Sequence, residues 1–203
     1  MEALVRGGPP VPYRRRGAGV TRCIVVTGSE CTGKTTLARA LAERMHVPWV
    51  PEASRAYAEE RRDEGRALTR EDVEPIARRD IAAADAALRS APAYLVLDTD
   101  LLSTVAYARH YYGACPAWIE AEARARRGTL YLLCAPDLPW LADGVRDRPA
   151  AREAMHAHFR SVLREFGAAV TEVRGFGLAR ERAAMATVDT ALAEAVEETP
   201  HRA

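Results

Sequence analysis

The eight residues from Gly28 to Thr35 constrain this chain more than any other segment. They read G-S-E-C-T-G-K-T and match the pattern G-x-x-x-x-G-K-[ST] at every defined position. Lys34 within this pattern is the only lysine of the 203-residue chain, which otherwise uses arginine. A compact ammonium on a flexible stem reaches over a loop to bound phosphates, whereas a planar guanidinium fits there badly. The pattern therefore predicts a phosphate-binding loop.

The residues on either side of the pattern support this prediction. Cys23 to Val26 form a short apolar run typical of a buried strand, and Leu37, Leu41 and Met45 are spaced four apart, as on one face of a helix. Such a loop surrounds a phosphate with backbone N–H groups at a helix N-terminus. We expect these residues to bind ATP, with Thr35 also ligating Mg²⁺: Gly28, Glu30, Cys31, Thr32, Gly33, Lys34, Thr35 and Thr36.

Length and composition favour one cytoplasmic domain. The chain is 48% hydrophobic, which is enough for one substantial core. Its net charge of +1, with acids interspersed among the arginines, gives no case for bulk nucleic-acid affinity. No apolar run approaches membrane-spanning length, and the N-terminus lacks a signal-peptide core. The four cysteines show no C-x-x-C spacing, so neither a zinc site nor a disulfide framework is expected. A homo-oligomer remains possible.

Both ends of the chain are expected to be loose. Residues 1–20 contain Gly-Gly-Pro-Pro and an arginine triplet without periodic apolar residues, which predicts a flexible basic tail. Residues 198–203 are expected to form a loose C-terminal tail. The interpretation leaves 21–197 as a single domain.

Strand-like and helix-like segments alternate through this domain. Further strands are predicted at 47–50, 94–97, 130–133 and 169–173, and helices at about 54–64, 70–90, 101–126, 149–166 and 178–196. Alternation of this kind indicates an α/β fold with a five-stranded parallel sheet flanked by helices. Ligands of such sheets bind beyond the carboxyl ends of the strands.

Two carboxylates follow the strand predicted at 94–97. Asp98 and Asp100 flank Thr99, and alternate strand residues point to the same side. An acid at this position either holds Mg²⁺ or accepts the proton of an attacking hydroxyl. The sequence does not divide these roles between the two residues. Alternatively, Asp100 caps a helix that begins at Leu101, which still leaves Asp98 functional.

A stretch rich in proline, glycine and arginine follows the strand predicted at 130–133. In phosphoryl-transfer enzymes, arginines carried by a lid neutralise charge on the moving phosphoryl group and exclude water. Arg146 is the candidate for a catalytic arginine, and Arg148 and Arg152 are candidates for contacts with ATP. Because arginine is abundant in this chain, each of them is equally well explained as a surface residue.

Five segments together resemble a known family. They read G-S-E-C-T-G-K-T-T-L, V-P-E-A-S-R-A-Y, L-D-T-D-L-L-S-T, Y-Y-G-A-C-P-A-W and P-D-L-P-W-L-A-D-G-V-R. They resemble the ribosylnicotinamide kinase domain of NadR-type NAD-salvage proteins. The resemblance implies a P-loop kinase fold and transfer of the γ-phosphoryl group of ATP, with Mg²⁺, to the 5′-hydroxyl of nicotinamide riboside, giving nicotinamide mononucleotide.

The resemblance also implies roles for particular residues. Lys34 and Thr35 would serve nucleotide and metal, and Asp98 and Asp100 the hydroxyl and metal, with Asp100 taken as the metal ligand. Acceptor contacts are expected from Glu52, Arg55, Tyr57 and Asp98, with Tyr112 or Trp140 stacking on the pyridinium ring. For these two aromatic residues, partly buried packing is the stronger alternative.

The sequence also bears on the functions that could be alternatives to this kinase. NadR regulators carry a helix-turn-helix and an adenylyltransferase domain with an H-x-G-H signature, which this sequence lacks, so we expect a stand-alone kinase. A regulatory GTPase or nucleotide-dependent binding module is disfavoured because the chain has no asparagine, no glutamine and no second lysine with which to read guanine or orient water. A kinase for another nucleoside or small molecule stays open.

Overall fold

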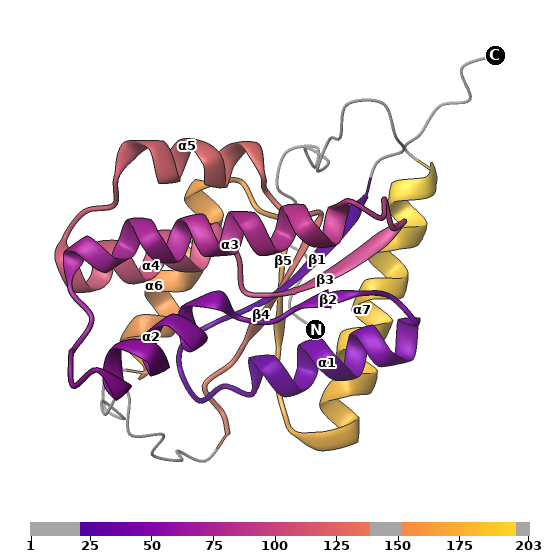
Figure 1. The fold of residues 1–203 in the computed structure, drawn as a ribbon. Helices are drawn as coiled ribbons and strands as arrows, with labels where there is room; N and C mark the ends of the chain where they lie inside the picture. The colour runs from indigo at the N-terminus through magenta and orange to yellow at the C-terminus, as the bar shows by residue number, and fades with distance from the viewer. Residues whose placement is uncertain (1–20, 139–151, 198–203) are drawn as a thin grey trace.

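Five parallel strands form the centre of the protein in the computed structural model, which describes residues 21–138 and 152–197 (Figure 1). The strands are β1 (Arg22–Thr27), β2 (Trp49–Val50), β3 (Tyr94–Asp98), β4 (Leu130–Cys134) and β5 (Val170–Val173). Their order in the sheet is β2-β3-β1-β4-β5, and all neighbours are parallel. The predicted five-stranded parallel sheet is thus confirmed.

Eight helical segments connect and cover the described strands. They are α1 (Lys34–Met45), α2 (Ala53–Asp63), the short 3₁₀ helix η1 (Arg70–Asp72), α3 (Val73–Leu88), α4 (Leu101–Tyr112), α5 (Ala117–Ala125), α6 (Arg152–Glu165) and α7 (Gly177–Glu197). The single helix predicted over 101–126 is wrong, since α4 and α5 are separate. Gly113 ends α4 in a left-handed conformation (φ 77°), and Pro116 caps the start of α5.

The second strand is shorter than predicted. The sequence indicated a strand over 47–50, but only Trp49–Val50 pairs with β3. Pro48 has no N–H to donate and contributes only its carbonyl oxygen, which accepts from the N–H of Val96 at 3.1 Å. β2 is therefore a short edge strand.

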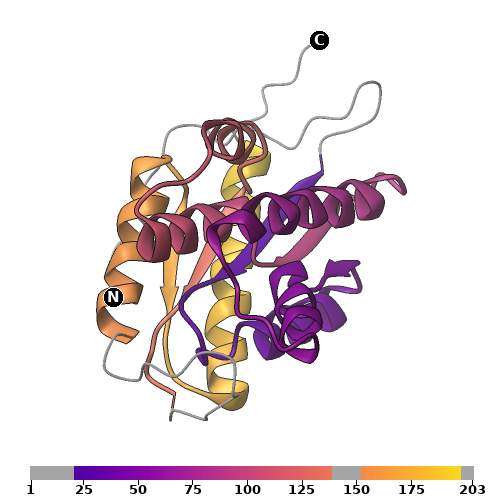
Figure 2. The same ribbon diagram turned by 60° about the vertical axis from the view of Figure 1, so that its left-hand side comes forward.

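Alternate residues of each strand pack into two separate cores. Ile24 and Val26 of β1 face the layer formed by α1 and α7, whereas Val25 between them faces α3, α4, α5 and α6. All three are fully buried, and burial of one such side chain stabilises the fold by about 1.5–3 kcal/mol. Figure 2 shows the two helical layers on opposite sides of the sheet.

The strand order brings the two predicted motifs together. β1 lies between β3 and β4, with Val26 opposite Asp98 and Thr27 opposite Leu133. The loop that leaves β1 therefore emerges directly beside the end of β3. Both meet at the carboxyl edge of the sheet, where ligands of parallel sheets bind.

Candidate active site

The loop between β1 and α1 has a backbone that requires glycine at two positions. Gly28 has φ 139°, and a Cβ atom there would lie 2.9 Å from the carbonyl oxygen of Cys134. Gly33 has φ 73°, and a Cβ atom there would lie 2.8 Å from a methyl carbon of Leu138. Both the conformation and the close approach exclude larger side chains. The two defined glycines of the motif thus shape the loop.

Lys34 folds back over this loop. Its Nζ donates to the carbonyl oxygen of Ser29 at 2.9 Å, and the hydroxyl of Thr32 donates to the same oxygen at 2.8 Å. The residue is 6% exposed, and the first turn of α1 contains no acidic residue. An ammonium held over a helix N-terminus without competing acids is suited to bind an anionic phosphate.

Asp98 is buried at the end of β3 without a hydrogen-bond partner among the described residues. It is 2% exposed, and neither carboxylate oxygen accepts a hydrogen bond of standard geometry from any of them. Burial raises the pKa of this carboxyl group, and so does the charge of Glu52. The Thr35 hydroxyl, which lies close to the carboxylate but outside standard hydrogen-bond geometry, opposes the rise, as do the charges of Lys34 and Arg55. A buried carboxylate with no partner is costly unless a ligand completes it.

Asp100 has different surroundings. Its Oδ1 accepts from the N–H of Leu102 at 3.0 Å, which caps α4, and its Oδ2 accepts from the hydroxyl of Tyr131 at 2.6 Å. Burial raises its pKa to about 6. Thr99 has φ 69°, so strand alternation does not continue to Asp100. The capping alternative describes these contacts, and the metal role of Asp100 stays a prediction.

A pocket lies between α3 and the ends of β2 and β3. Its lining residues are Val50, Pro51, Asp80, Ile81, Ala84, Leu97, Asp98, Thr99, Asp100 and Leu101. Asp80 was not predicted from the sequence. The hydroxyl of Thr104 donates to it at 2.9 Å, and burial raises its pKa to about 7. A usable signal existed, because Asp80 interrupts an apolar row of α3 between Ile76 and Ala84.

Two arginines reach the outer side of the phosphate-binding loop. Arg152, the predicted candidate, begins α6 and donates to the carbonyl oxygens of Leu138 at 2.9 Å and Cys31 at 3.3 Å. Arg180 of α7 was missed. It is 4% exposed, its Nη1 lies 3.6 Å from the Cβ position of Gly33, and no described residue accepts from its Nε or Nη1. Arg180 reaches the loop only because α7 packs beneath the loop, which the local sequence does not indicate.

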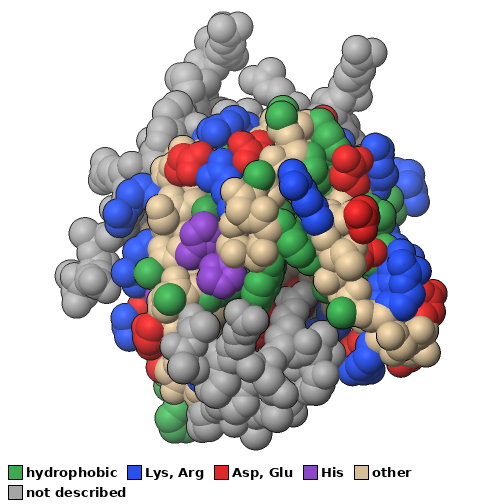
Figure 3. Space-filling view, turned by 90° about the vertical axis from the view of Figure 1, so that its left-hand side faces the viewer, with side chains coloured by type: hydrophobic (Ala, Val, Ile, Leu, Met, Phe, Trp, Pro, Cys, Tyr) green, Lys and Arg blue, Asp and Glu red, His purple; other side chains and the backbone are tan. Residues whose placement is uncertain are grey.

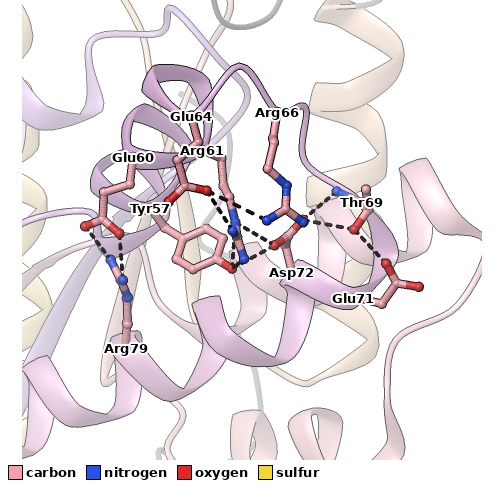
Figure 4. Close-up of polar contacts among 9 residues, drawn as sticks. All are labelled: Tyr57, Glu60, Arg61, Glu64, Arg66, Thr69, Glu71, Asp72 and Arg79. Carbon is pink, nitrogen blue, oxygen red and sulfur yellow. Dashed lines mark hydrogen bonds and ion pairs between the residues drawn. The ribbon is translucent and has the colours of Figure 1, made fainter.

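The predicted acceptor residues are spread over several places. Glu52 follows β2, accepts from the hydroxyl of Ser54 at 2.7 Å and lies 3.7 Å from Nε of Arg55. Tyr57 points into a polar network between α2 and α3, not into the pocket (Figure 4). Tyr112 packs against the core at the end of α4. Their acceptor roles stay predictions, while Trp140, Arg146 and Arg148, with most of the predicted lid, lie outside the described residues.

The surface charges, the grouping of possible metal ligands and the lengths of the helices further limit what the described residues can bind. Figure 3 shows acidic and basic side chains interspersed over one end of the molecule, without a continuous basic surface. Across 21–138 and 152–197, no three or more His, Cys, Asp or Glu side chains are grouped so as to hold a metal ion on their own. Within the same ranges, every helix is too short or too polar to cross a membrane.

The chain is similar in sequence to curated proteins. The chain is 29% identical over 126 residues to the trifunctional NAD biosynthesis/regulator proteins NadR of Salmonella typhimurium and Escherichia coli, covering 62% of the chain and 31% of each relative. The chain thus spans about a third of the length of these curated relatives.

Solved structures show the same likeness. A NadR protein in complex with NR has a TM-score of 0.68 and 27% identity, over 84% of this chain and 51% of that one. A NadR complex with NAD and AMP-PNP gives 0.66 and 26%, over 84% and 49%. Thymidylate kinase of Ehrlichia chaffeensis, at 13% identity over 85% and 98% of the two chains and a TM-score of 0.58, shares the fold.

The match to a family covers most of the chain. The family AAA_28, described as an AAA domain, matches residues 23–182, which include the phosphate-binding loop, the end of β3 and Arg180. The fold, the loop geometry and these likenesses agree. The protein belongs to the AAA_28 family, and over part of their length it is similar to the NadR proteins.

Proposed function

We propose that the protein is a nicotinamide riboside kinase, which transfers the γ-phosphoryl group of ATP to the 5′-hydroxyl of nicotinamide riboside. The observation that carries this proposal is Asp98, a buried carboxylate without a described partner, beside a P-loop whose Lys34 is folded back over it. A P-loop serves many NTPases. An unpartnered acid next to it supplies what a kinase needs in addition, namely an acceptor for the proton of the attacking hydroxyl.

In this proposal Lys34, Asp98 and Arg152 have separate tasks. Lys34 exchanges its contact with the Ser29 carbonyl oxygen for the phosphates of ATP. Asp98 accepts the 5′-hydroxyl proton as the new O–P bond forms, and ADP leaves. Arg152, held against the loop by Cys31, stabilises charge from the outer side, and Arg146 and Arg148 are proposed to add to it.

Magnesium would neutralise the phosphates of the bound ATP. Thr35 fits this role because its hydroxyl lies at the start of α1 close to Asp98. Asp100 fits less well, since Leu102 and Tyr131 each donate to one of its oxygens. A role through a bridging water is what remains for Asp100.

The relatives support the choice of acceptor. One NadR structure contains NR and another contains NAD with AMP-PNP. The chain covers about half of those proteins at 26–27% identity. The substrate is therefore a proposal and is not transferred directly from them. We propose that the protein works on small molecules in the cytoplasm, without nucleic acid or membrane partners.

The test is a turnover screen with ATP and Mg²⁺. The acceptors are nicotinamide riboside, adenosine, guanosine, cytidine, uridine and thymidine, and both ADP release and the phosphorylated product are measured. We expect nicotinamide mononucleotide at a rate well above ATP hydrolysis without acceptor, and no product with Lys34→Ala. Rapid phosphorylation of ordinary nucleosides with none of nicotinamide riboside would overturn the proposal.

A further inference from the structure

We infer that the pocket between α3 and the ends of β2 and β3 selects a positively charged acceptor, and that Asp80 is the residue that makes this selection. The inference rests on the proposed function for the location of the reacting hydroxyl. It adds the property of the acceptor that the pocket recognises. Neither the P-loop nor Asp98 determines the charge of the acceptor, because both are needed for any acceptor.

The pocket brings together carboxyl groups from three different elements. Asp80 comes from the middle of α3, Asp98 from the end of β3 and Asp100 from the cap of α4. None of its ten described lining residues is Lys or Arg. The remaining walls include Val50 and Leu97, which are apolar and exclude water. Charges in such a site interact more strongly than in water, so a cation there would be favoured.

The three carboxylates differ in how far the protein satisfies them. Asp100 accepts two hydrogen bonds of its own, from Leu102 and Tyr131, and Asp80 accepts one from Thr104. Asp98 is 2% exposed and accepts none from the described residues. This buried side chain lines the pocket with hydrogen-bonding capacity that the described residues leave unused in standard geometry, and a ligand would use it.

The position of Asp80 in the wall of the pocket, beside other carboxyl groups, makes it the group whose charge a cationic ligand would stabilise. Burial is the largest cause of its raised pKa, the bond from Thr104 opposes it, and the charges of Glu52 and Asp100 raise it further. Among the described residues, no Lys or Arg is a cause of this shift. A cationic ligand would favour its ionised form, whereas a neutral nucleoside would leave the repulsion in place.

The apolar walls favour a flat cation with delocalised charge. Ile81 and Ala84 on α3 lie along the same pocket as Leu97 of β3. An ammonium would have to give up its hydration here, while an aromatic cation loses less and packs against apolar side chains. The pyridinium ring of nicotinamide riboside is such a group, since it carries a permanent positive charge.

Two acceptors that differ chiefly in charge test this inference. Nicotinamide riboside and its 1,4-dihydro form offer the same 5′-hydroxyl and closely similar rings, but only the first ring is charged. We expect Asp80→Asn to lower kcat/KM for nicotinamide riboside about tenfold, mainly through KM, and to change kcat/KM for the dihydro form less than about twofold. An equal loss with both acceptors, or no loss with either, would overturn the inference.

A matched control lies on the same helix. Asp85 is five residues further along α3, bonds to Arg126 at 2.6 Å and does not line the pocket. Asp85→Asn should leave the ratio between the two acceptors unchanged. Asp80→Ser removes the same charge with a different side chain. It should show the same selective loss, so the test does not depend on whether one of the two variants folds poorly.

Binding without ATP separates this inference from the proposed function. Calorimetric titration of both acceptors into wild type and Asp80→Asn measures charge selection even if no phosphoryl group is transferred. If Asp80→Asn weakens the binding of nicotinamide riboside but not of its dihydro form, the inference is supported. If the affinity for nicotinamide riboside is unchanged, the inference is refuted. The wild-type turnover screen decides the proposed function separately.

Discussion

Asp72 and Asp98 are equally buried, yet the protein treats their charges in opposite ways. Asp72 is 4% exposed and sits in the network between α2 and α3 shown in Figure 4. Its Oδ1 accepts from the hydroxyl of Tyr57 at 2.7 Å and from Nε of Arg61 at 3.1 Å, and its Oδ2 from the N–H of Thr69 at 2.8 Å. Asp98, at 2%, accepts nothing from the described residues.

The pKa values of the two groups differ accordingly. Burial alone would raise the pKa of Asp72, but the bonds from Tyr57 and Thr69 and the charge of Arg61 together hold it below its ordinary value. For Asp98 burial prevails, and the pKa is raised. A buried carboxylate whose hydrogen bonds are all satisfied by the protein stabilises the fold and needs no ligand. A buried carboxylate with unsatisfied oxygens can instead be satisfied by a bound ligand. Asp98, not Asp72, is therefore the carboxylate for which we propose a catalytic role.

The largest expected effect follows from removing the charge that lacks a partner. Asp98→Asn should lower turnover about a thousandfold, since loss of a general base removes a factor of 10² to 10⁴. The midpoint of thermal unfolding should fall little, because no described hydrogen bond is lost. Turnover across a Mg²⁺ titration is the measurement.

Asp100→Asn sharpens that result. A metal role predicts that this variant needs more Mg²⁺ but recovers turnover, while a base role predicts low turnover at every Mg²⁺ concentration. Wild-type behaviour of both variants would contradict the assignment of the strand end.

The second effect concerns shape at constant charge. Lys34→Arg should lower turnover about a hundredfold, in the range for losing one preorganised donor. The guanidinium cannot repeat the close fold of Nζ over the loop to Ser29. Steady-state kinetics with ATP measure this, and a wild-type rate would show that the single lysine has no catalytic significance.

The third effect should appear in stability and not in turnover. Asp72→Asn should lower the free energy of unfolding by about 2 kcal/mol at pH 7, because donors of Thr69 and Arg61 lose a charged acceptor. Since the folded pKa of Asp72 is depressed, its contribution is present above the ordinary value of 3.8 and is lost as the pH falls through the folded pKa. Urea unfolding between pH 7 and pH 3 should therefore show the difference shrinking.

Tyr57→Phe tests the same network with a smaller change. The lost hydroxyl donates to Asp72 at 2.7 Å and accepts from Arg61, so we expect about 1.5 kcal/mol of destabilisation. Turnover and KM for the acceptor should stay within about twofold of wild type. A large rise in that KM with unchanged stability would instead support the acceptor role predicted for Tyr57 from the sequence.

The smallest effect reports on occupancy of the loop. Cys31 is partly exposed there, with φ 54°, while Cys23 and Cys134 are buried and burial raises the pKa of both. ATP with Mg²⁺ at four times its Kd should slow alkylation of Cys31 about fivefold, since a fifth of the protein stays free. Peptide mapping after iodoacetamide treatment measures this. Equal labelling with and without ATP would place the phosphates elsewhere.

The loop could be predicted from its motif, the sheet from the periodicity of apolar residues, and the position of Asp98 at the edge of the sheet from its place directly after a predicted strand. The break between α4 and α5 was readable from Gly113 and Pro116 and was overlooked. Asp80 and Arg180 are of another kind. They join the site only because α3 packs over β3 and α7 returns beneath the loop, which no short window of sequence records.

The surroundings of Asp98 also have an entropic consequence. On one side, Asp98 pairs with Val26 in the sheet and the N–H of Thr99 bonds to the Val26 carbonyl oxygen at 2.9 Å. On the other, Asp100 is held by Tyr131, whose hydroxyl in turn accepts from the N–H of Gly128 at 2.9 Å. The backbone that carries the proposed base is thus immobilised during folding. An acceptor that arrives loses its own freedom of motion but does not have to restrict that of Asp98.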